Sequence, residues 1–282
     1  MDVNEFILED SIWSYSRINA FELCPYQYYL QYIKGIRSVD NVFGEYGTFM
    51  HSIFEKYFKG ELNIFELEDY FIKNYYENVK LDFPPSRVDL KASYFEKGRE
   101  YFENFSGFEG ECKGVEQKYF FKVGNYDFTG IVDYEGIVNG EVEIIDHKSK
   151  TNKDSSGRLA CKTRLTKKDL VFDYIELVDG RFLHREFIRQ LYLYCIPLYE
   201  KYKKYPAYLN VNMCKENDWY RWEFNKSDFE ETKQWAIDII NRIYKTEKFL
   251  KGDMTKDNYF CDWICGVSGF CKNSSKFLGV EI

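Results

Sequence analysis

The feature that most restricts the fold of this chain is a run of three consecutive strand-like segments near its middle. The segments VEQKYFFKV, YDFTGIVDYEGIV and EVEIIDHKS lie between residues 115 and 149. Short turns at Gly124-Asn125 and Asn139-Gly140 join them, and Asn-Gly between apolar segments is a strong hairpin signal. The sequence therefore predicts three strands that are connected as successive hairpins.

Helical patterns surround these strands. In the first half, Ser14 or Ser16 can cap a helix to about Ile33, and apolar spacing predicts further helices at residues 47–57, 64–79 and 88–105. In the second half we expect a strand or short helix at 170–178, strands at 207–213 and 219–224, and helices at 183–202 and from Ser227 to about Phe249. This order predicts an α/β or α+β fold in which helices flank a mixed sheet.

The composition excludes two classes of protein. Of 282 residues, 45% are hydrophobic and 30% are charged, which is too apolar for a disordered chain and enough for a sizeable core. The formal net charge is −7, so the whole molecule is not a polycation that coats duplex DNA. Any contact with nucleic acid must come from a local basic groove.

We expect a cytoplasmic protein. No apolar stretch is long enough to span a bilayer, and the acidic start MDVNEFILED lacks the basic segment of a secretory signal. In a reducing compartment the eight cysteines are not expected to form disulfides. Some of them are therefore candidates for metal ligation.

Two carboxylates and one ammonium are predicted on neighbouring strands. Asp146 and Lys148 are two apart on the third strand and share a face, and a hairpin can bring Asp133 beside them. Carboxylates bind hard cations such as Mg²⁺, a metal so held activates water towards a phosphodiester, and a lysine can stabilise the charge that develops. An exposed Asp-x-Lys is more often a solvated ion pair, but the apolar E-V-E-I-I run and the second aspartate favour a site.

Four short motifs resemble those of one nuclease family. G-I-V-D at 130–133 and D-H-K at 146–148 are similar to the second and third motifs of the PD-(D/E)XK nuclease superfamily. S-Y-S-R-I-N-A-F-E-L-C-P-Y-Q-Y-Y at 14–29, G-T-F-M-H at 47–51 and Q-L-Y-L-Y at 190–194 resemble RecB-like exonucleases, a group that includes the AddB nuclease domain and CRISPR-associated and phage exonucleases. The matches occur in family order over nearly the full chain. The resemblance implies a restriction-endonuclease-like mixed β-sheet core flanked by helices.

The resemblance also implies a role for each matching residue. It implies that Mg²⁺ or Mn²⁺ is bound by His51, Asp133, Asp146 and the backbone carbonyl of His147, whose side chain should point to the opposite face. It implies catalysis by Lys148, positioning of DNA by Gln190 and Tyr194, and an acidic position at Glu116. The activity would be that of a deoxyribonuclease, by analogy an exonuclease on single strands or DNA ends in recombination, repair or phage DNA processing. Its partner could be a helicase, a recombinase or a CRISPR adaptation protein.

The alternative from another class is a non-catalytic DNA-binding or scaffold subunit of a helicase–nuclease complex. The presence of Asp133, Asp146 and Lys148 argues against it, because a protein that only binds DNA does not need that set. In either case we expect one nuclease-like domain with a helical part at 1–110, a core at 111–225, and a long helix and tail at 226–282.

A second metal site is predicted from cysteines at the two ends of the chain. Cys261, Cys265 and Cys271 cluster near the C-terminus, and Cys24 precedes a proline near the N-terminus. Four thiolates suit Zn²⁺ or an iron–sulfur cluster, and spacing alone does not decide between them. The resemblance implies a 4Fe–4S cluster. The family tail has two residues between its first two cysteines, whereas this chain has three, so the position of Cys261 departs from the family pattern. The remaining cysteines, Cys112, Cys161, Cys195 and Cys214, are scattered and are interpreted as structural.

Basic residues follow the third strand. The polar segment from Lys150 to Lys168 is interpreted as a loop that contacts substrate, because it directly follows Lys148. A second basic run consists of Lys201, Lys203 and Lys204.

Overall fold

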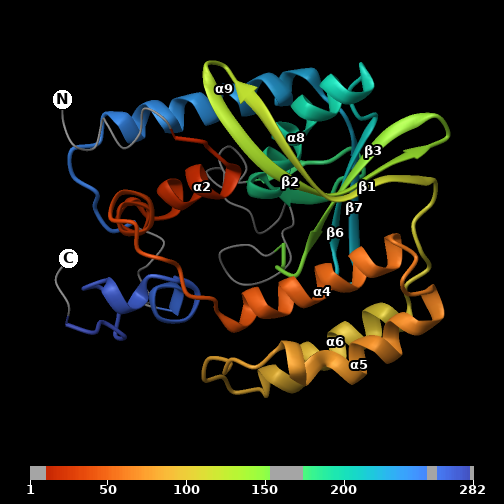
Figure 1. The fold of residues 1–282 in the computed structure, drawn as a ribbon, viewed down its shortest axis with the longest axis horizontal. Coiled ribbons are helices and arrows are strands. Elements are labelled where there is room, and N and C mark those ends of the chain that lie inside the picture. Colours follow the sequence, from red (N-terminus) through yellow and green to blue (C-terminus); the bar gives the residue numbers. More distant parts are fainter. Residues whose placement is uncertain (1–10, 153–173, 253–258, 280–282) are drawn as a thin grey trace. The chain divides into compact units, whose positions relative to one another are not determined.

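The core of the protein is a mixed five-stranded sheet (Figure 1). The computed structural model describes residues 11–152, 174–252 and 259–279. The sheet has the order β1-β2-β3-β6-β7, with the strands β1 Glu111–Val123, β2 Tyr126–Val138, β3 Glu141–Lys148, β6 Tyr208–Met213 and β7 Asp218–Glu223. β3 pairs antiparallel with β2 and parallel with β6, and β6 pairs antiparallel with β7. β4 Tyr174–Glu176 and β5 Phe182–His184 form a separate two-stranded sheet.

The two predicted hairpin turns are present. Asn139 and Gly140 have φ values of +50° and +81°, which is the left-handed backbone that a two-residue turn between right-twisted strands requires. Gly124 opens the first turn with φ +59°. The three strands predicted from the sequence are therefore β1, β2 and β3.

Along the chain, helices come before β1 and after β7, and one helix connects β5 to β6. Their bounds are α2 Tyr15–Leu23, α3 Pro25–Tyr28, η1 Tyr29–Ile33, α4 Val42–Phe58, η2 Ile64–Glu66, α5 Leu67–Asn78, α6 Leu90–Glu103, α8 Arg185–Tyr202, α9 Lys226–Tyr244, η4 Phe260–Ile264 and η5 Ser268–Phe270. The arrangement confirms the predicted class of a mixed sheet with flanking helices.

Two details of the helices differ from the prediction. The expected single helix to Ile33 is interrupted, because Cys24 has extended backbone and Pro25 starts the next helix. Ser14 does cap α2, since its side chain accepts a hydrogen bond from Arg17 N–H. The cap of α9, however, is Asn225 and not Ser227, because the Asn225 side chain accepts from the N–H groups of Ser227 and Asp228.

The chain divides into two compact units, which we call the terminal unit and the central unit. The terminal unit consists of Met1–Gly44, Phe120–Gly130 and Glu231–Ile282, and the central unit of Glu45–Tyr119 and Ile131–Glu230.

In the central unit, the two faces of the sheet are covered by different helices. Ile144 of β3 belongs to a buried apolar cluster with Leu191 and Leu198 of α8. His147, whose side chain points to the opposite face, stacks on Phe54 of α4 with ring centroids 4.1 Å apart. One side of β3 therefore faces α8, and the other faces α4.

In the terminal unit, the chain before α2 joins the far end of β2. Trp13 N–H donates to Asp127 O at 2.8 Å, and Thr129 N–H donates to Trp13 O at 2.8 Å. The Trp13 ring contacts Tyr126 and Tyr244, and the Arg17 guanidinium lies over it at 4.6 Å. This aromatic packing joins the three segments of the unit.

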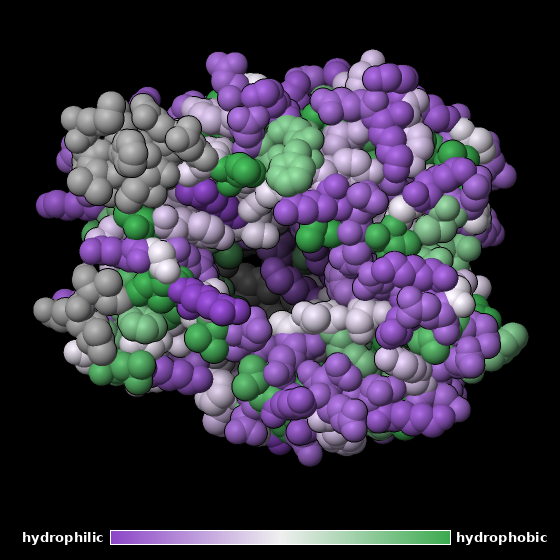
Figure 2. Space-filling view, in the orientation of Figure 1, coloured by the Kyte–Doolittle hydropathy of each residue, from purple (hydrophilic) through white to green (hydrophobic). Residues whose placement is uncertain are grey.

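The surface is mainly hydrophilic on the face that Figure 2 shows, with hydrophobic residues in small separate patches. Of the helices that the structure describes, none has the length and apolar composition of a membrane span.

Candidate metal centre

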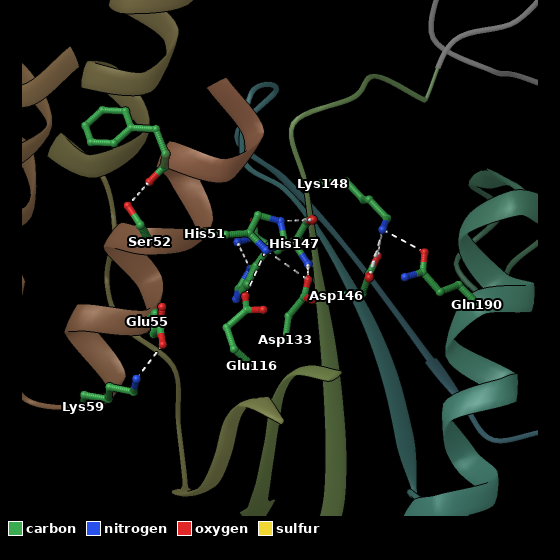
Figure 3. Close-up of polar contacts among 12 residues, drawn as sticks. His51, Ser52, Glu55, Lys59, Glu116, Asp133, Asp146, His147, Lys148 and Gln190 are labelled. Atoms are coloured by element: carbon green, nitrogen blue, oxygen red, sulfur yellow. Dashed lines mark hydrogen bonds and ion pairs between the residues drawn. The ribbon is translucent and has the colours of Figure 1, made fainter. Parts of the chain in front are cut away.

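The candidate site is built on neighbouring positions of β2 and β3 in the central unit (Figure 3). Tyr134 pairs with Ile145, so Asp133 and Asp146 are adjacent across the two strands and point to the face opposite that pair. Both side chains are buried, with relative exposures of 7% and 1%. Asp133 Oδ2 also accepts a hydrogen bond from His147 N–H at 2.8 Å, which fixes the carboxylate against β3.

His51 reaches this position from α4. Its Nε2 lies 2.9 Å from the backbone oxygen of His147, and its Nδ1 lies 3.1 Å from Glu116 Oε1 and 3.7 Å from Asp133 Oδ2. Within the described ranges, His51, Glu116 and Asp133 are the one group of three candidate ligands whose donor atoms all lie within 4.8 Å of one another. One imidazole and two carboxylates form a donor set that suits a hard or borderline divalent cation.

The protonation of His51 provides a test of fit for such a cation. Burial opposes a positive charge on the ring, but the Glu116 hydrogen bond and the Asp133 charge outweigh it and raise the pKa of His51 to about 9. Both ring nitrogens face oxygen acceptors, an arrangement that favours the doubly protonated imidazolium. A proton thus lies among oxygens where a metal ion could replace it.

The two aspartates also favour a bound cation. Burial raises the pKa of Asp133, although His51 and Lys148 oppose the shift. Burial likewise raises the pKa of Asp146, an effect that Lys148 opposes and Asp133 reinforces. Two buried carboxylates that disfavour each other's charge would be stabilised by added positive charge.

Glu116 owes its place to an unusual backbone conformation. Its φ is +47°, in the left-handed region, although it lies inside β1. Such a residue costs roughly 1–2 kcal/mol and persists where the surroundings enforce it, often at functional sites. The local sequence, which reads as an ordinary strand, carries no signal for this conformation.

Asp146 and Lys148 form a buried pair beside the group of three. Lys148 Nζ lies 2.9 Å from Asp146 Oδ1 and 2.7 Å from Oδ2. Burial alone would lower the pKa of Lys148, but Asp146 and Asp133 raise it, so the ammonium remains charged. Asp146, which the sequence analysis expected as a metal ligand, thus faces the lysine.

Gln190 and Tyr194 continue this chain of contacts from α8. Lys148 donates to Gln190 Oε1 at 2.9 Å, and Gln190 Nε2 donates to the Tyr194 hydroxyl at 3.0 Å. Tyr194 itself is buried, with a relative exposure of 6%. The structure therefore brings Gln190 to the lysine and Tyr194 to Gln190.

The four predicted cysteine ligands lie together in the terminal unit. Cys24, Cys261 and Cys271 are buried, Cys265 is half-buried, and all four line one small cavity. Burial, reinforced by the other three thiols, raises the pKa of Cys265 to about 12. Such a cluster would lose its protons readily only with a cation among the sulfurs.

The backbone around the cysteines accommodates the unusual spacing of Cys261 and Cys265. Cys261 lies in the π-turn η4 and Cys265 caps its end, where Cys265 N–H donates to Phe260 O at 2.8 Å. A π-turn contains one residue more than an α-turn, and this is the extra residue in the motif. At Cys24, the sulfur accepts a hydrogen bond from Gly252 N–H at 3.4 Å. A Cβ on Gly252 would lie 2.1 Å from Leu23 O, which is too close for any residue other than glycine.

The predicted basic segments are only partly described. Most of the Lys150–Lys168 segment, including residues 153–168, lies outside the described residues. Lys150 lies 3.6 Å from Glu186. Lys201 pairs with the fully buried carboxylate of Glu135, which the sequence analysis did not single out, and Lys204 pairs with Glu141.

The comparisons with known proteins point to one family. Residues 12–272 match the PD-(D/E)XK nuclease superfamily. Among solved structures, the crystal structure of a protein from Eubacterium rectale, named as a candidate exonuclease, aligns with a TM-score of 0.44 at 12% identity. That alignment covers 90% of this chain and 88% of the other. No curated protein matches the sequence.

Proposed function

The chain belongs to the PD-(D/E)XK nuclease superfamily, and from this premise we propose that it is a deoxyribonuclease that acts as an exonuclease on single strands or DNA ends. The family implies a nuclease that uses a divalent metal. The observation that carries the proposal for this chain is the convergence of His51, Glu116 and Asp133 beside the Asp146–Lys148 pair.

Mg²⁺ or Mn²⁺ would be held by His51, Glu116 and Asp133, with Asp146 and the His147 carbonyl as the remaining oxygen donors at the site. The ion would supply a polarised phosphodiester oxygen and an activated water. His51 would give up one ring proton to admit it, because a ligating nitrogen must be free of its hydrogen.

Lys148 would stabilise charge on the scissile phosphate. Its side chain is 19% exposed, so one part reaches solvent while Asp146 and Gln190 hold the ammonium in place. A donor fixed before the reaction needs no reorganisation when negative charge develops, and this is the usual source of large electrostatic rate effects.

For Gln190 and Tyr194 we propose a role through the lysine. The contacts run from the Tyr194 hydroxyl to Gln190 and from Gln190 to Lys148, so the pair would orient the ammonium. This differs from the DNA-positioning role expected from the resemblance, and the two roles predict different kinetic effects.

For the cysteines we propose a 4Fe–4S cluster bound by Cys24, Cys261, Cys265 and Cys271. Support comes from their convergence on one cavity and from the π-turn that fits the spacing of Cys261 and Cys265. A tetrahedral zinc site, with Zn–S of about 2.3 Å, needs sulfurs within about 4 Å of one another. A 4Fe–4S cluster spaces its four thiolates more widely, and the metal content of the purified protein distinguishes the two.

The decisive experiment compares digestion of end-labelled linear and circular DNA, single- and double-stranded, with Mg²⁺ or Mn²⁺. We expect the wild type to degrade linear strands and Asp133→Asn to be inactive while it keeps its circular dichroism spectrum. Asp127→Asn is the matched control, because Asp127 lies on the same strand but is exposed and pairs with Lys122. Cleavage of circular strands would indicate an endonuclease. DNA binding without cleavage under any metal would support the non-catalytic subunit instead.

A further inference from the structure

A cavity of the central unit lies apart from the metal centre. Its volume is about 590 Å³, and it spreads over the sheet face that bears Ile145 and Asn210. Asp146 and Lys148 point to the opposite face, so the cavity is separated from them by the thickness of the sheet. A cavity of this size is within the range that proteins use for small organic ligands.

The walls of the cavity are aromatic. They include Phe105, Phe108 and Trp219, and the rings of Phe108 and Trp219 lie 5.3 Å apart at an angle of 40°. Trp219 is held in this orientation because its indole N–H donates to Asn210 Oδ1 at 3.2 Å. Fixed aromatic faces beside an open space favour a flat ring as the occupant.

Two polar atoms of buried side chains at the cavity have no hydrogen-bond partner among the described residues. Tyr134 and Asn212 are only 2% and 1% exposed, and both line the cavity. Asn212 uses its Nδ2 for Tyr101 and His147, while its Oδ1 and the Tyr134 hydroxyl have no hydrogen bond to any described residue. Both side chains line the cavity, so these two atoms are available to an occupant.

The position of the Tyr134 hydroxyl depends on a glycine. A Cβ on Gly136 would lie 2.4 Å from that hydroxyl, so only glycine allows the ring to lie along β2. The floor of the cavity thus offers one acceptor from an amide and one hydroxyl that can donate or accept.

The charges at the cavity disfavour a phosphate. Glu109, Glu143 and Asp218 line it against one cation, Arg221. Arg221 is already paired with Glu143 at 2.7 Å and lies over the Tyr208 ring at 3.4 Å. Asp218 is likewise paired, with Arg181 at 2.9 Å, so an anionic ligand would meet no unpaired cation among the lining residues, whereas an uncharged ring needs none.

We propose that this cavity binds an uncharged, planar, hydrogen-bonding heterocycle of the nucleobase type. The ring stacks on the aromatic walls and hydrogen-bonds to Asn212 Oδ1 and the Tyr134 hydroxyl. The base comes either from a free nucleoside or from an unpaired nucleotide of a bound strand. The inference does not depend on the nuclease proposal, because the cavity is tested by binding alone.

The experiment measures binding to the whole protein in EDTA, where no cleavage can occur. Adenosine, guanosine, cytidine and thymidine, their 5′-monophosphates, and spermidine are titrated by calorimetry and by thermal shift. We expect at least one nucleoside to bind and to raise the melting temperature, and its monophosphate to bind more weakly. Tyr134→Phe should weaken the nucleoside about tenfold through loss of one hydrogen bond. The control is Tyr199→Phe, whose exposed ring lies on α8 outside the cavity.

A second arm distinguishes the two sources of the base. Single-stranded oligonucleotides are compared with abasic ones of the same length. If Tyr134→Phe weakens only the oligonucleotides that carry bases, the occupant is a base of the bound strand; if it weakens free nucleosides, the occupant is a free nucleoside. The proposal is overturned if nothing binds at millimolar concentration, if Tyr134→Phe changes neither arm, or if monophosphates or spermidine bind more tightly than nucleosides.

Discussion

At the scale of single residues, His147 organises the candidate site with its backbone. Its N–H donates to Asp133 and its carbonyl oxygen faces His51, so one peptide segment holds two of the proposed ligands. Its ring lies on the other side of the sheet, as the alternation of β3 requires, and burial keeps its pKa well below the ordinary value. The site therefore uses the main chain of this residue and not its imidazole.

We predict that Lys148→Met reduces cleavage by at least about a hundredfold, because an electrostatic group aimed at the reacting phosphate is lost. The measurement is the single-turnover rate on labelled DNA at saturating metal. Lys122→Met is the control, since Lys122 is exposed and pairs with Asp127 away from the metal centre. A Lys148→Met protein of wild-type activity would remove this lysine from the mechanism.

The two roles considered for Gln190 can be separated by kinetics. If Gln190 orients Lys148, Gln190→Ala should lower kcat roughly tenfold with little change in KM, and Tyr194→Phe should have a smaller effect of the same kind. A rise in KM for DNA at constant kcat would instead support direct contact with the strand. The measurement is a full kcat and KM determination for each variant.

The proton on His51 predicts how metal binding depends on pH. Because the pKa of His51 is about 9, metal must displace this proton, and apparent metal affinity should rise with pH by up to about tenfold per unit below that value. In the metal-free protein the same proton stabilises the fold below the ordinary histidine pKa of about 6.5, and this contribution is lost as the pH rises towards 9.

Titrations with Mn²⁺ under argon at several pH values measure the slope. His51→Gln should flatten it, whereas His184→Asn should leave it unchanged, because His184 caps α8 and has no place in the metal group. Metal affinity independent of pH in the wild type would exclude His51 as a ligand.

At the scale of elements, helix α4 and the segment after β3 approach each other closely. A Cβ on Gly47 would lie 3.0 Å from Ser149 Oγ, next to Lys148. Glycine inside a helix costs about 1 kcal/mol relative to alanine, and this close approach gives a physical reason for its presence.

We predict that Gly47→Ala lowers activity severalfold without lowering the melting temperature, because the new methyl displaces the segment that carries Lys148. The double variant Gly47→Ala with Ser149→Ala should recover activity, since the remaining Cβ of Ser149 lies at an ordinary 3.9 Å. Cleavage rates and thermal melts of the three proteins provide the check. Undiminished activity in the single variant would contradict the steric argument.

The same scale shows what the sequence could and could not predict. The strands β1 to β3 and their turns were predictable, because alternation and Asn139-Gly140 act locally. The cap of α9 was predicted two residues too late, since Asn225 and Ser227 are both good caps and only tertiary structure selects between them. The left-handed backbone of Glu116 was not predictable, because the residues around it follow an ordinary strand pattern. The residues of the candidate site came from the resemblance more than from spacing.

At the scale of the whole molecule, the four cysteines connect the first and last segments of the terminal unit. Cys24 belongs to Met1–Gly44, and the other three belong to Glu231–Ile282. Ligation by both segments would close a very long loop, and the free energy of ligation would add to that of folding.

We predict that anaerobically purified protein is brown, with absorption near about 400 nm, and contains iron rather than zinc. Cys24→Ser should lose the colour and melt at a lower temperature, whereas Cys112→Ser, at an exposed position, should retain both properties. Metal analysis and thermal melts measure the outcome. A colourless wild type that contains zinc, or an unaltered melt of Cys24→Ser, would count against the cluster.

The hairpin of β1 and β2 has a practical consequence for anyone who wants a minimal catalytic fragment. Glu116 and Asp133 belong to the central unit, but the turn that joins their strands, Phe120–Gly130, belongs to the terminal one. A fragment that keeps the hairpin of Glu116 and Asp133 therefore also keeps Phe120–Gly130, which is a part of the terminal unit. Trimming from either end would strip the partners of that turn, so dissection should yield insoluble pieces and not a smaller working enzyme.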